Sequence, residues 1–276
     1  MKSVLFAATE AVPFVKTGGL GEVIGSLPRE LRRQGIDARV IIPCYEDIPT
    51  EYRRKFTFLT SFEVTVGWRK QYCGILYYED AGLPVYFVDN EYYFRRHGLY
   101  GYYDDGERFA FFCRAVLESL PKIPLTPQLI HCHDWQTAMI CTLLKTTYGQ
   151  QPFYEQMRTL YTVHNLKYQG LFPKETLGEL WGLNWEQFTS EGLEFYDQLN
   201  CMKGGIVYAD AVSTVSRTYS QEIQQPFYGE KLEGVLRQRE PVLYGITNGI
   251  DETKYNPVSD PSLFVNYDWT EWPKKK

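Results

Sequence analysis

The chain has 276 residues, of which 44% are hydrophobic and 23% charged, the composition of a globular protein with room for a sizeable core. Its net charge of −5 gives no electrostatic support for binding nucleic acid or an anionic membrane, so an anionic ligand must be captured locally. There is no apolar run of roughly 18 residues, no signal-peptide core and no CxxC pair among six cysteines, which predicts a cytoplasmic protein with reduced, mostly buried thiols.

Short apolar runs alternate with longer helical patterns along the chain, which is typical of βαβ units and a mainly parallel sheet. The elements expected in the first half are, in order, a strand at 4–8, a helix at 25–34, a strand at 37–43, three short strands within 62–89 and a helix at 108–120. Gly35 ends the first helix, in which Leu27 and Leu31 share one apolar face. The segment 62–89 predicts an antiparallel hairpin that leads into a third buried strand.

The second half of the chain continues the same alternation. Its expected elements are a strand at 128–134, a helix at 137–148, a strand at 158–165, an irregular stretch with short helices at 166–200, and strands at 211–216 and 242–251, each preceded by a helical pattern. The chain therefore predicts an α/β fold in which a mainly parallel sheet carries helices on both faces.

Residues 16–25, KTGGLGEVIG, form a glycine-rich loop directly before the first predicted helix. Glycines let backbone N–H groups approach a ligand and a helix N-terminus attracts anions, so this loop predicts a phosphate site. Gly19, Gly21 and Gly25 resemble a loosened dinucleotide fingerprint, but nine residues intervene after the strand, and the second strand ends without an acidic residue. A P-loop is excluded because Lys16 precedes the glycines, and no GxSxG elbow of a serine hydrolase is present.

Three further polar clusters follow predicted strands, at His133–Asp134, His164–Asn165 and Asn248–Gly249. In open α/β sheets ligands bind at the carboxyl ends of the strands, so we expect these clusters and the glycine-rich loop to meet at one edge of the sheet. Each cluster has an ordinary alternative. Asp134 would be a helix N-cap, His164 a hydrogen-bonded structural residue, and the third cluster a turn. The convergence of all four at one edge favours a functional site.

Two other features of the sequence suggest a ligand-binding site. His131 and His133 flank Cys132, which suggests a metal, but we expect the strand to turn their side chains to opposite faces and therefore expect no metal site. Nine tyrosines fall between Tyr72 and Tyr103. Most are expected to be half-buried packing residues, and the others would form a surface on which carbohydrate rings stack. A non-catalytic glucan-binding module is therefore an alternative function.

Bacterial glycogen synthases and plant starch synthases resemble this chain over nearly its whole length, in the segments KTGGLGEV, HCHDWQTA, TVHNLKYQG, EGLEFYDQLNCMKGGIVYAD, VSTVSRTYSQEI and ITNGID. The family has the GT-B architecture, in which two Rossmann-like domains face each other across the active site. The resemblance implies a retaining glucosyltransferase that moves glucose from a nucleotide sugar, usually ADP-glucose in bacteria, to the non-reducing end of an α-1,4-glucan. It also implies that no metal is required and that no cofactor is bound, with ADP-glucose taking part as a substrate.

The matching positions imply catalytic and donor-binding roles. Lys16 corresponds to the lysine that lies against the phosphates of the donor, and Gly18 and Gly19 to glycines that let the backbone approach them. His164 resembles the histidine next to the reacting carbon of the donor glucose. Asp134 resembles a polar residue on the glucose and acceptor side.

Four more substrate-binding positions follow from the same resemblance. Asn165 and Asn248 resemble polar residues that line the glucose and acceptor side, and the region of Tyr100 is expected to meet the growing chain. Glu22 stands where relatives commonly have Asp, so its carboxylate reaches one methylene further toward the glucose.

The resemblance also predicts the domain organisation. It divides the chain into an N-terminal, acceptor-side Rossmann-like domain at 1–250 and a linker at 251–276 toward a C-terminal nucleotide-binding domain that we expect to be missing. We expect the chain alone to be inactive, because the second domain supplies most nucleotide contacts in the family. A GT-B transferase with another donor or acceptor is an alternative, whereas the loop spacing disfavours a nicotinamide-dependent oxidoreductase.

Overall fold

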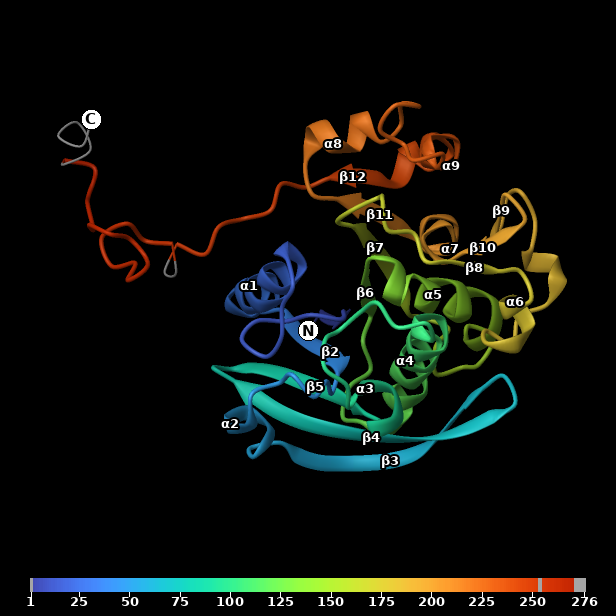
Figure 1. The fold of residues 1–276 in the computed structure, drawn as a ribbon, viewed down its shortest axis with the longest axis horizontal. Coiled ribbons are helices and arrows are strands. Elements are labelled where there is room, and N and C mark those ends of the chain that lie inside the picture. Colours follow the sequence, from blue (N-terminus) through green and yellow to red (C-terminus); the bar gives the residue numbers. More distant parts are fainter. Residues whose placement is uncertain (1, 253–254, 271–276) are drawn as a thin grey trace.

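The fold is taken from a computed structural model, which describes residues 2–252 and 255–270. The strands of its main sheet are β1 (Ser3–Ala7), β2 (Asp37–Pro43), β3 (Thr57–Val66), β4 (Arg69–Asp80), β5 (Leu83–Asp89), β6 (Leu129–His133), β7 (Arg158–Val163), β11 (Ala211–Thr214) and β12 (Leu243–Gly245). They are arranged in the order β12-β11-β7-β6-β1-β2-β5-β4-β3 (Figure 1). Neighbours from β12 to β5 run parallel, and β4 and β3 add an antiparallel hairpin at one edge. The expected α/β fold is confirmed.

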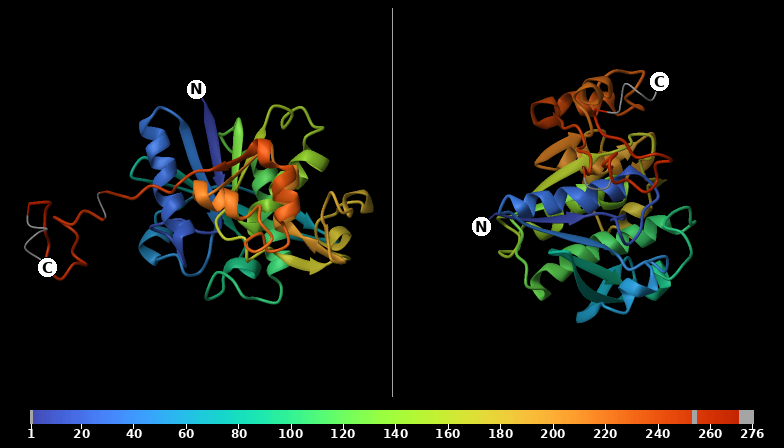
Figure 2. Two further views of the ribbon diagram at one scale, coloured as in Figure 1. Left: turned by 90° about the horizontal axis from the view of Figure 1, so that it is seen from above. Right: turned by 90° about the vertical axis from the view of Figure 1, so that its left-hand side faces the viewer.

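Helices cover both faces of the parallel strands. The helices are α1 (Gly19–Arg33), α2 (Thr50–Arg53), α3 (Glu91–Phe94), α4 (Asp105–Ser119), α5 (Trp135–Leu143), α6 (Thr176–Glu179), α7 (Cys201–Tyr208), α8 (Arg217–Glu222) and α9 (Glu233–Gln238). Helix α5 packs against α4 and α7, whereas α1 packs against β2 and β5 (Figure 2). The crossovers from β1 to β2 and from β6 to β7 run in opposite directions, so right-handed connections place α1 and α5 on opposite faces.

This arrangement creates a switch point between β1 and β6, where the strand order reverses. In open α/β sheets the crevice at the carboxyl ends of such a pair is the usual ligand site. Strands with helices on both faces need apolar side chains at successive positions, and Leu5, Phe6 and Ala7 of β1 are all fully buried. The core thus holds the carboxyl end of β1 rigidly beside that of β6.

Every expected strand is present, although β3 begins at Thr57, before the predicted segment 62–89, and β12 covers only Leu243–Gly245 of the predicted 242–251. The first helix differs more from its prediction. Helix α1 begins at Gly19, six residues before the predicted start, so part of the glycine-rich loop is its first turn. Its buried side chains include Leu20 and Ile24, whereas Leu27 is 37% exposed. The predicted apolar face was therefore wrong at Leu27. The buried residues of α1 include Leu20, Gly21 and Ile24 in its first two turns, where the glycines had suggested a loop.

The stretch 166–200 contains a small second sheet in addition to the expected short helices. Its strands are β8 (Leu171–Pro173), β9 (Glu194–Phe195) and β10 (Gln198–Asn200), in the order β8-β10-β9. Strands of two or three residues leave no readable alternation in the sequence, which explains why this sheet was not predicted.

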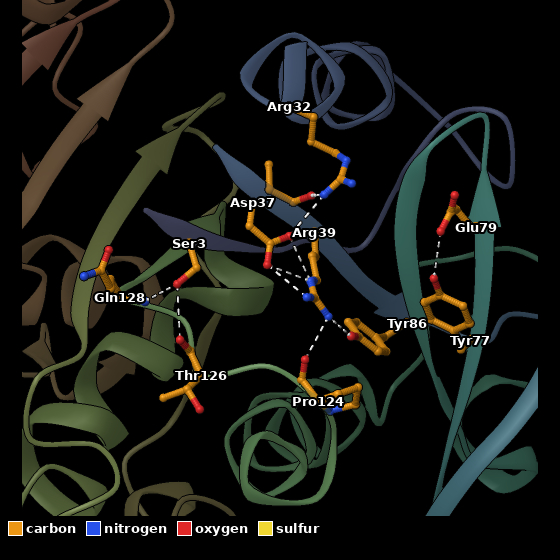
Figure 3. A network of polar contacts seen from close by, with 11 residues as sticks. Ser3, Arg32, Asp37, Arg39, Tyr77, Glu79, Tyr86, Pro124, Thr126 and Gln128 are labelled. Atoms are coloured by element: carbon orange, nitrogen blue, oxygen red, sulfur yellow. Dashed lines mark hydrogen bonds and ion pairs between the residues drawn. The ribbon is translucent and has the colours of Figure 1, made fainter. Parts of the chain in front are cut away.

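A polar network closes the amino-terminal edge of the main sheet, opposite the switch-point crevice (Figure 3). Arg39 on β2 donates to the Asp37 carboxylate at 2.9 Å, to the Tyr86 hydroxyl on β5 at 2.7 Å and to the Pro124 carbonyl at 3.0 Å. Arg32 at the end of α1 also donates to Asp37, at 3.1 Å. This network ties α1, β2, β5 and the segment before β6 together.

The C-terminal part of the chain has a different character. Residues 251–252 and 255–270 contain no helix or strand and run away from the sheet (Figure 1). The division into 1–250 and 251–276 stays a prediction, and the final EWPKKK at 271–276 lies outside the described residues.

All six cysteines are buried and free, as predicted. Within the described part of the chain, no helix combines the length and apolar character needed to cross a membrane.

Candidate functional site

Glu10 follows β1 and holds the glycine-rich loop in place. One oxygen of its buried carboxylate accepts the backbone N–H groups of Thr17 at 2.5 Å and of Gly18 at 3.2 Å. The other accepts the Thr17 hydroxyl at 2.7 Å and the Tyr100 hydroxyl at 2.8 Å, and Thr9 also contacts that tyrosine hydroxyl at 2.7 Å. Two N–H and two O–H donors thus fix one carboxylate. Sequence reasoning missed Glu10, because only its tertiary contacts distinguish it from any other glutamate.

The N–H groups left for an anion begin at Gly19. Gly18 is the N-cap of α1 and its own N–H is held by Glu10, while Gly19, Leu20 and Gly21 form the first turn, where a helix has no internal partners for these donors. A Cβ added at Gly18 or Gly19 would meet no atom within 4 Å, whereas one at Gly21 would lie 2.6 Å from the Cβ of Lys16. The loop is therefore open at its first two glycines and closely packed at the third.

Lys16 and Glu22, both predicted to contact the donor, contact each other. The Lys16 ammonium lies 2.6 Å from a Glu22 carboxylate oxygen, and the lysine side chain is 51% exposed. An ion pair this exposed contributes at most about 1 kcal/mol to stability. It therefore places the lysine beside the open N-terminus of α1 without preventing its exchange to another anion.

Asp134 directly follows β6 and has a strained backbone. Its φ of 56° and ψ of −179° fall in a region that residues with a Cβ rarely adopt. It occupies the N-cap position of α5, but its side chain makes no capping hydrogen bond. Instead Oδ1 accepts the backbone N–H groups of His164 at 2.8 Å and Asn165 at 3.4 Å. The capping alternative is wrong, and this side chain ties the carboxyl end of β6 to that of β7.

Three histidines gather at the same edge. His131 and His133 lie on one face of β6, with ring centroids 4.0 Å apart. The expectation of opposite faces was wrong, because residues two apart in a strand point to the same side. The Nδ1 of His133 is 2.9 Å from Nε2 of His164, and the Nε2 of His131 is 2.6 Å from the Thr162 hydroxyl. Among the described residues, no group of three or more His, Cys, Asp or Glu side chains is placed to hold a metal ion.

Burial sets the charges of this cluster. It lowers the pKa of His164 to about 4, against an opposing effect of the Glu10 carboxylate, and it lowers the pKa of His131 to about 3. It raises the pKa of Asp134 to about 7, although the N–H groups of His164 and Asn165 oppose this rise. Since Glu10 also raises the pKa of Asp134, the loop after β1 and the ends of β6 and β7 share one electrostatic environment.

The remaining predicted residues are arranged differently. Asn165 is exposed beside His164, and its Oδ1 accepts the backbone N–H of Lys167 at 3.0 Å. Asn248 lies on the exposed chain after β12 and takes no part in the hydrogen bonds that join the other site residues. Tyr100 directs its hydroxyl to Glu10, so its contact is with the loop. The structure thus unites the loop, β6 and β7, and leaves Asn248 on an exposed segment.

A pocket of about 500 Å³ adjoins the loop. Its lining combines the segment 12–17 with Asp47, Gly98 and Leu99. Asp47 accepts the backbone N–H of Gly98 at 2.7 Å, which holds the far wall of the pocket. This volume lies in the range of small-ligand sites.

The tyrosine-rich segment is divided between core and surface. Tyr86 and Tyr93 are fully buried, as packing residues should be. Tyr72, Tyr92 and Tyr103 are 51%, 59% and 95% exposed. These three aromatic rings are the part of the segment that remains available for stacking against a ligand.

Comparison with known proteins places the chain beside enzymes of glucan synthesis. A family model described as the starch synthase catalytic domain matches residues 3–238. The glycogen synthases of Desulforamulus reducens and Alkaliphilus metalliredigens are 56% identical over 264 residues and 54% identical over 273 residues. These matches cover 96% and 99% of this chain, but 55% and 58% of the relatives. The chain therefore spans about half the length of the curated relatives it matches.

A solved structure shares the fold closely. The catalytic domain of starch synthase IV from Arabidopsis thaliana, bound to ADP and acarbose, matches with a TM-score of 0.89 and 33% sequence identity. The match covers 97% of this chain and 55% of that chain. The mainly parallel sheet and its helices are thus those of a starch synthase catalytic domain.

Proposed function

Since this chain belongs to the starch synthase catalytic domain family, we propose that it forms the acceptor-side half of a retaining glucosyltransferase. In the proposed reaction, glucose passes from ADP-glucose to the non-reducing end of an α-1,4-glucan, and its anomeric configuration is retained. One observation carries the proposal. The glycine-rich loop, Asp134 and His164 lie at the carboxyl edge of the sheet beside the switch point, where α/β sheets bind their ligands.

The loop supplies the groups that a nucleoside diphosphate requires. Lys16 brings an exposed ammonium, and the N–H groups of Gly19 and Leu20 point out of an uncapped helix N-terminus. As the glucosyl–phosphate bond breaks, negative charge develops on the leaving diphosphate, and fixed donors stabilise it. The loss of one such donor typically lowers the rate about 10²–10³-fold. The ADP in the Arabidopsis enzyme supports an adenine nucleotide as the leaving group.

We assign His164 and Asp134 to the binding of the reacting glucose. The ring of His164 is neutral at pH 7, because burial lowers its pKa to about 4, so it offers a hydrogen bond without a charge. Asp134 fixes the backbone of His164 and lies beside the same space. Glu10 is not proposed as a nucleophile, because its carboxylate already accepts four hydrogen bonds. The resemblance to retaining glycogen and starch synthases favours a front-face transfer, in which the leaving phosphate takes the proton of the attacking hydroxyl.

We propose that turnover needs a second domain that completes the nucleotide site. The support is that the matched glycogen synthases are nearly twice as long as this chain. The test compares the 276-residue chain with a chimera, in which residues 1–250 are joined to the remaining part of the Desulforamulus reducens glycogen synthase. Both are given radiolabelled ADP-glucose and glycogen.

The expected result is labelled glycogen from the chimera and none from the chain alone. Turnover by the chain alone would overturn the requirement for a second domain. A folded chimera without transfer from either ADP-glucose or UDP-glucose would overturn the proposed reaction.

A non-catalytic glucan-binding module is the second candidate, because Tyr72, Tyr92 and Tyr103 keep exposed rings. Titration of the chain with maltooligosaccharides distinguishes the two. Tight binding that is unaffected by ADP-glucose, together with an inactive chimera, would favour the module.

A further inference from the structure

The rings of His133 and His164 share a single hydrogen bond. The Nδ1 of His133 lies 2.9 Å from the Nε2 of His164, and a contact between two ring nitrogens at this distance requires one proton between them. Burial keeps both rings neutral at pH 7, so each carries one proton. Only two arrangements are therefore open. Either His133 donates and His164 accepts, or the reverse holds.

The two arrangements differ at the outer nitrogens. If His133 donates from Nδ1, its Nε2 is a bare lone pair and the proton of His164 sits on Nδ1. If His164 donates from Nε2, the proton of His133 sits on Nε2 and the Nδ1 of His164 becomes an acceptor. The surroundings of the Nε2 of His133 therefore decide which hydrogen-bonding group His164 presents.

That nitrogen is enclosed by rings. Phe6 stacks on His133 with ring centroids 5.8 Å apart and an interplanar angle of 16°, and His131 lies at 4.0 Å. The Nε2 of His133 is fully buried, and no atom of the described residues hydrogen-bonds to it. The neighbouring His131 is itself held in place, because its Nε2 contacts the Thr162 hydroxyl, which in turn contacts Ser213 at 2.6 Å. Among the described residues, the surroundings of the Nε2 of His133 thus supply no hydrogen-bond acceptor to it.

A buried N–H without an acceptor is a rare feature, and an unused lone pair is tolerated more readily. The first arrangement is the one that avoids a buried, unpaired N–H. On this ground we propose that His133 is a positioning residue, which donates its Nδ1–H to His164 and so fixes the proton of His164 on Nδ1. The half-buried ring of His164 then carries its N–H donor on Nδ1, the ring nitrogen that does not face His133.

This inference deepens the proposed function and rests on it for its catalytic meaning. An N–H donor at His164 selects ligand oxygens that accept hydrogen bonds, such as sugar oxygens or the oxygens of a leaving phosphate. Without His133 the ring of His164 would exchange between its two tautomers, and only part of the molecules would offer the donor.

The tautomer is measured directly by NMR. The chain contains four histidines, so ring ¹H–¹⁵N correlations of the ¹⁵N-histidine-labelled 276-residue chain at pH 7 are assignable, with a His164→Gln variant to identify the signals of that ring. The expected pattern for His164 is a protonated Nδ1 and an unprotonated Nε2. In His133→Leu, which removes the donor, the signals of His164 shift toward a mixture. In His133→Asn, whose side-chain amide can donate from nearly the position of Nδ1, the Nδ1–H pattern returns.

The catalytic readout uses the same substitutions in the chimera. We expect His133→Leu to lower kcat/KM for ADP-glucose about tenfold, the effect of losing one hydrogen bond, and His133→Asn to recover most of it. A protonated Nε2 on His164 in the unsubstituted chain would overturn the inference, as would an unchanged His164 pattern in His133→Leu. A confirmed tautomer in a chain whose chimera transfers no glucose would instead overturn the proposed function, since the NMR result does not depend on turnover.

Discussion

The backbone N–H of His164 donates to the carboxylate of Asp134 at 2.8 Å, so one side chain joins the carboxyl ends of two neighbouring parallel strands. Asp134 keeps this contact in a backbone conformation that costs on the order of 1–3 kcal/mol. The hydrogen bonds from the backbone N–H groups of His164 and Asn165 offset this cost, and they set the position of the histidine.

Substitution of Asp134 separates the hydrogen bond from the strain. Asp134→Asn retains an acceptor oxygen, Asp134→Gly relieves the strain without one, and Asp134→Ala does neither. We expect thermal stability to fall in the order Asn, Gly, Ala, and the Ala variant to lose about 1–3 kcal/mol from its unpaired N–H groups. Equal melting temperatures for Asn and Ala would contradict the structural role assigned to this carboxylate.

Glu10 is predicted to stabilise the glycine-rich loop through the four hydrogen bonds that its side-chain oxygens accept. Glu10→Gln places an amide N–H₂ against donors and is expected to cost about 2 kcal/mol, and Tyr100→Phe removes one of those donors at a cost of about 1 kcal/mol. Because the two side chains contact each other, the double variant should lose less than the sum. Urea unfolding measures the free energy of unfolding of the two single variants and of the double variant. Tyr103→Phe, at a 95% exposed position, is the matched control and should change nothing. Strict additivity would show that the two groups are not coupled.

Two glycines in the first turn of α1 are predicted to respond in opposite ways. Alanine at Gly21 would place its Cβ 2.6 Å from the Cβ of Lys16, so we expect a loss of about 1–3 kcal/mol in stability. Alanine at Gly19 meets open space and should leave stability unchanged or slightly raised. In the chimera, Gly19→Ala should nevertheless weaken binding of ADP-glucose, because the new methyl group occupies the approach to the loop. Unimpaired binding would place the diphosphate elsewhere.

The buried histidine also predicts a pH dependence of stability. The pKa of His164 is about 6.5 in the unfolded chain and about 4 in the folded one, so the unfolded chain binds more protons between these values. Its contribution is complete above pH 6.5 and is lost as the pH falls toward 4, by about 3 kcal/mol. Asp134 acts in the opposite direction, because folding raises its pKa to about 7.

The variant His164→Gln separates the contribution of His164 to the pH dependence of stability from that of Asp134. The free energy of unfolding of the unsubstituted chain should fall more steeply between pH 6.5 and 4 than that of His164→Gln. Parallel curves for the two proteins would contradict a neutral, buried His164.

The sheet was predictable because parallel strands leave a strong local signal. The run at 4–8 is apolar at every position, and the run at 37–43 is apolar from Val40 to Pro43, as strands buried on both faces require. The start of α1 was not predictable, since glycine is a poor helix former and only close packing explains a helix there. A Cβ at Gly25 would lie 2.9 Å from the carbonyl oxygen of Val12, a contact that no local pattern encodes.

The site was predictable as a set of positions, but not as a set of contacts. The rule that ligands bind at the carboxyl ends of strands correctly brought Asp134, His164 and the glycine-rich loop to one edge. It gave no sign of Glu10, whose importance rests on donors 7 to 90 positions away in the chain. The pairing of His133 with His164 likewise depends on the register of β6 beside β7.

The central claim is that this chain supplies catalytic groups of a glucosyltransferase, and glucose transfer by site variants of the chimera tests it most directly. Incorporation of radiolabelled glucose from ADP-glucose into glycogen should fall by at least about 100-fold in kcat/KM for both Lys16→Ala and His164→Ala. Lys70→Ala, at an exposed position of β4, should behave like the unsubstituted chimera. Near-normal transfer by both site variants would contradict the assignment of this crevice as the catalytic site.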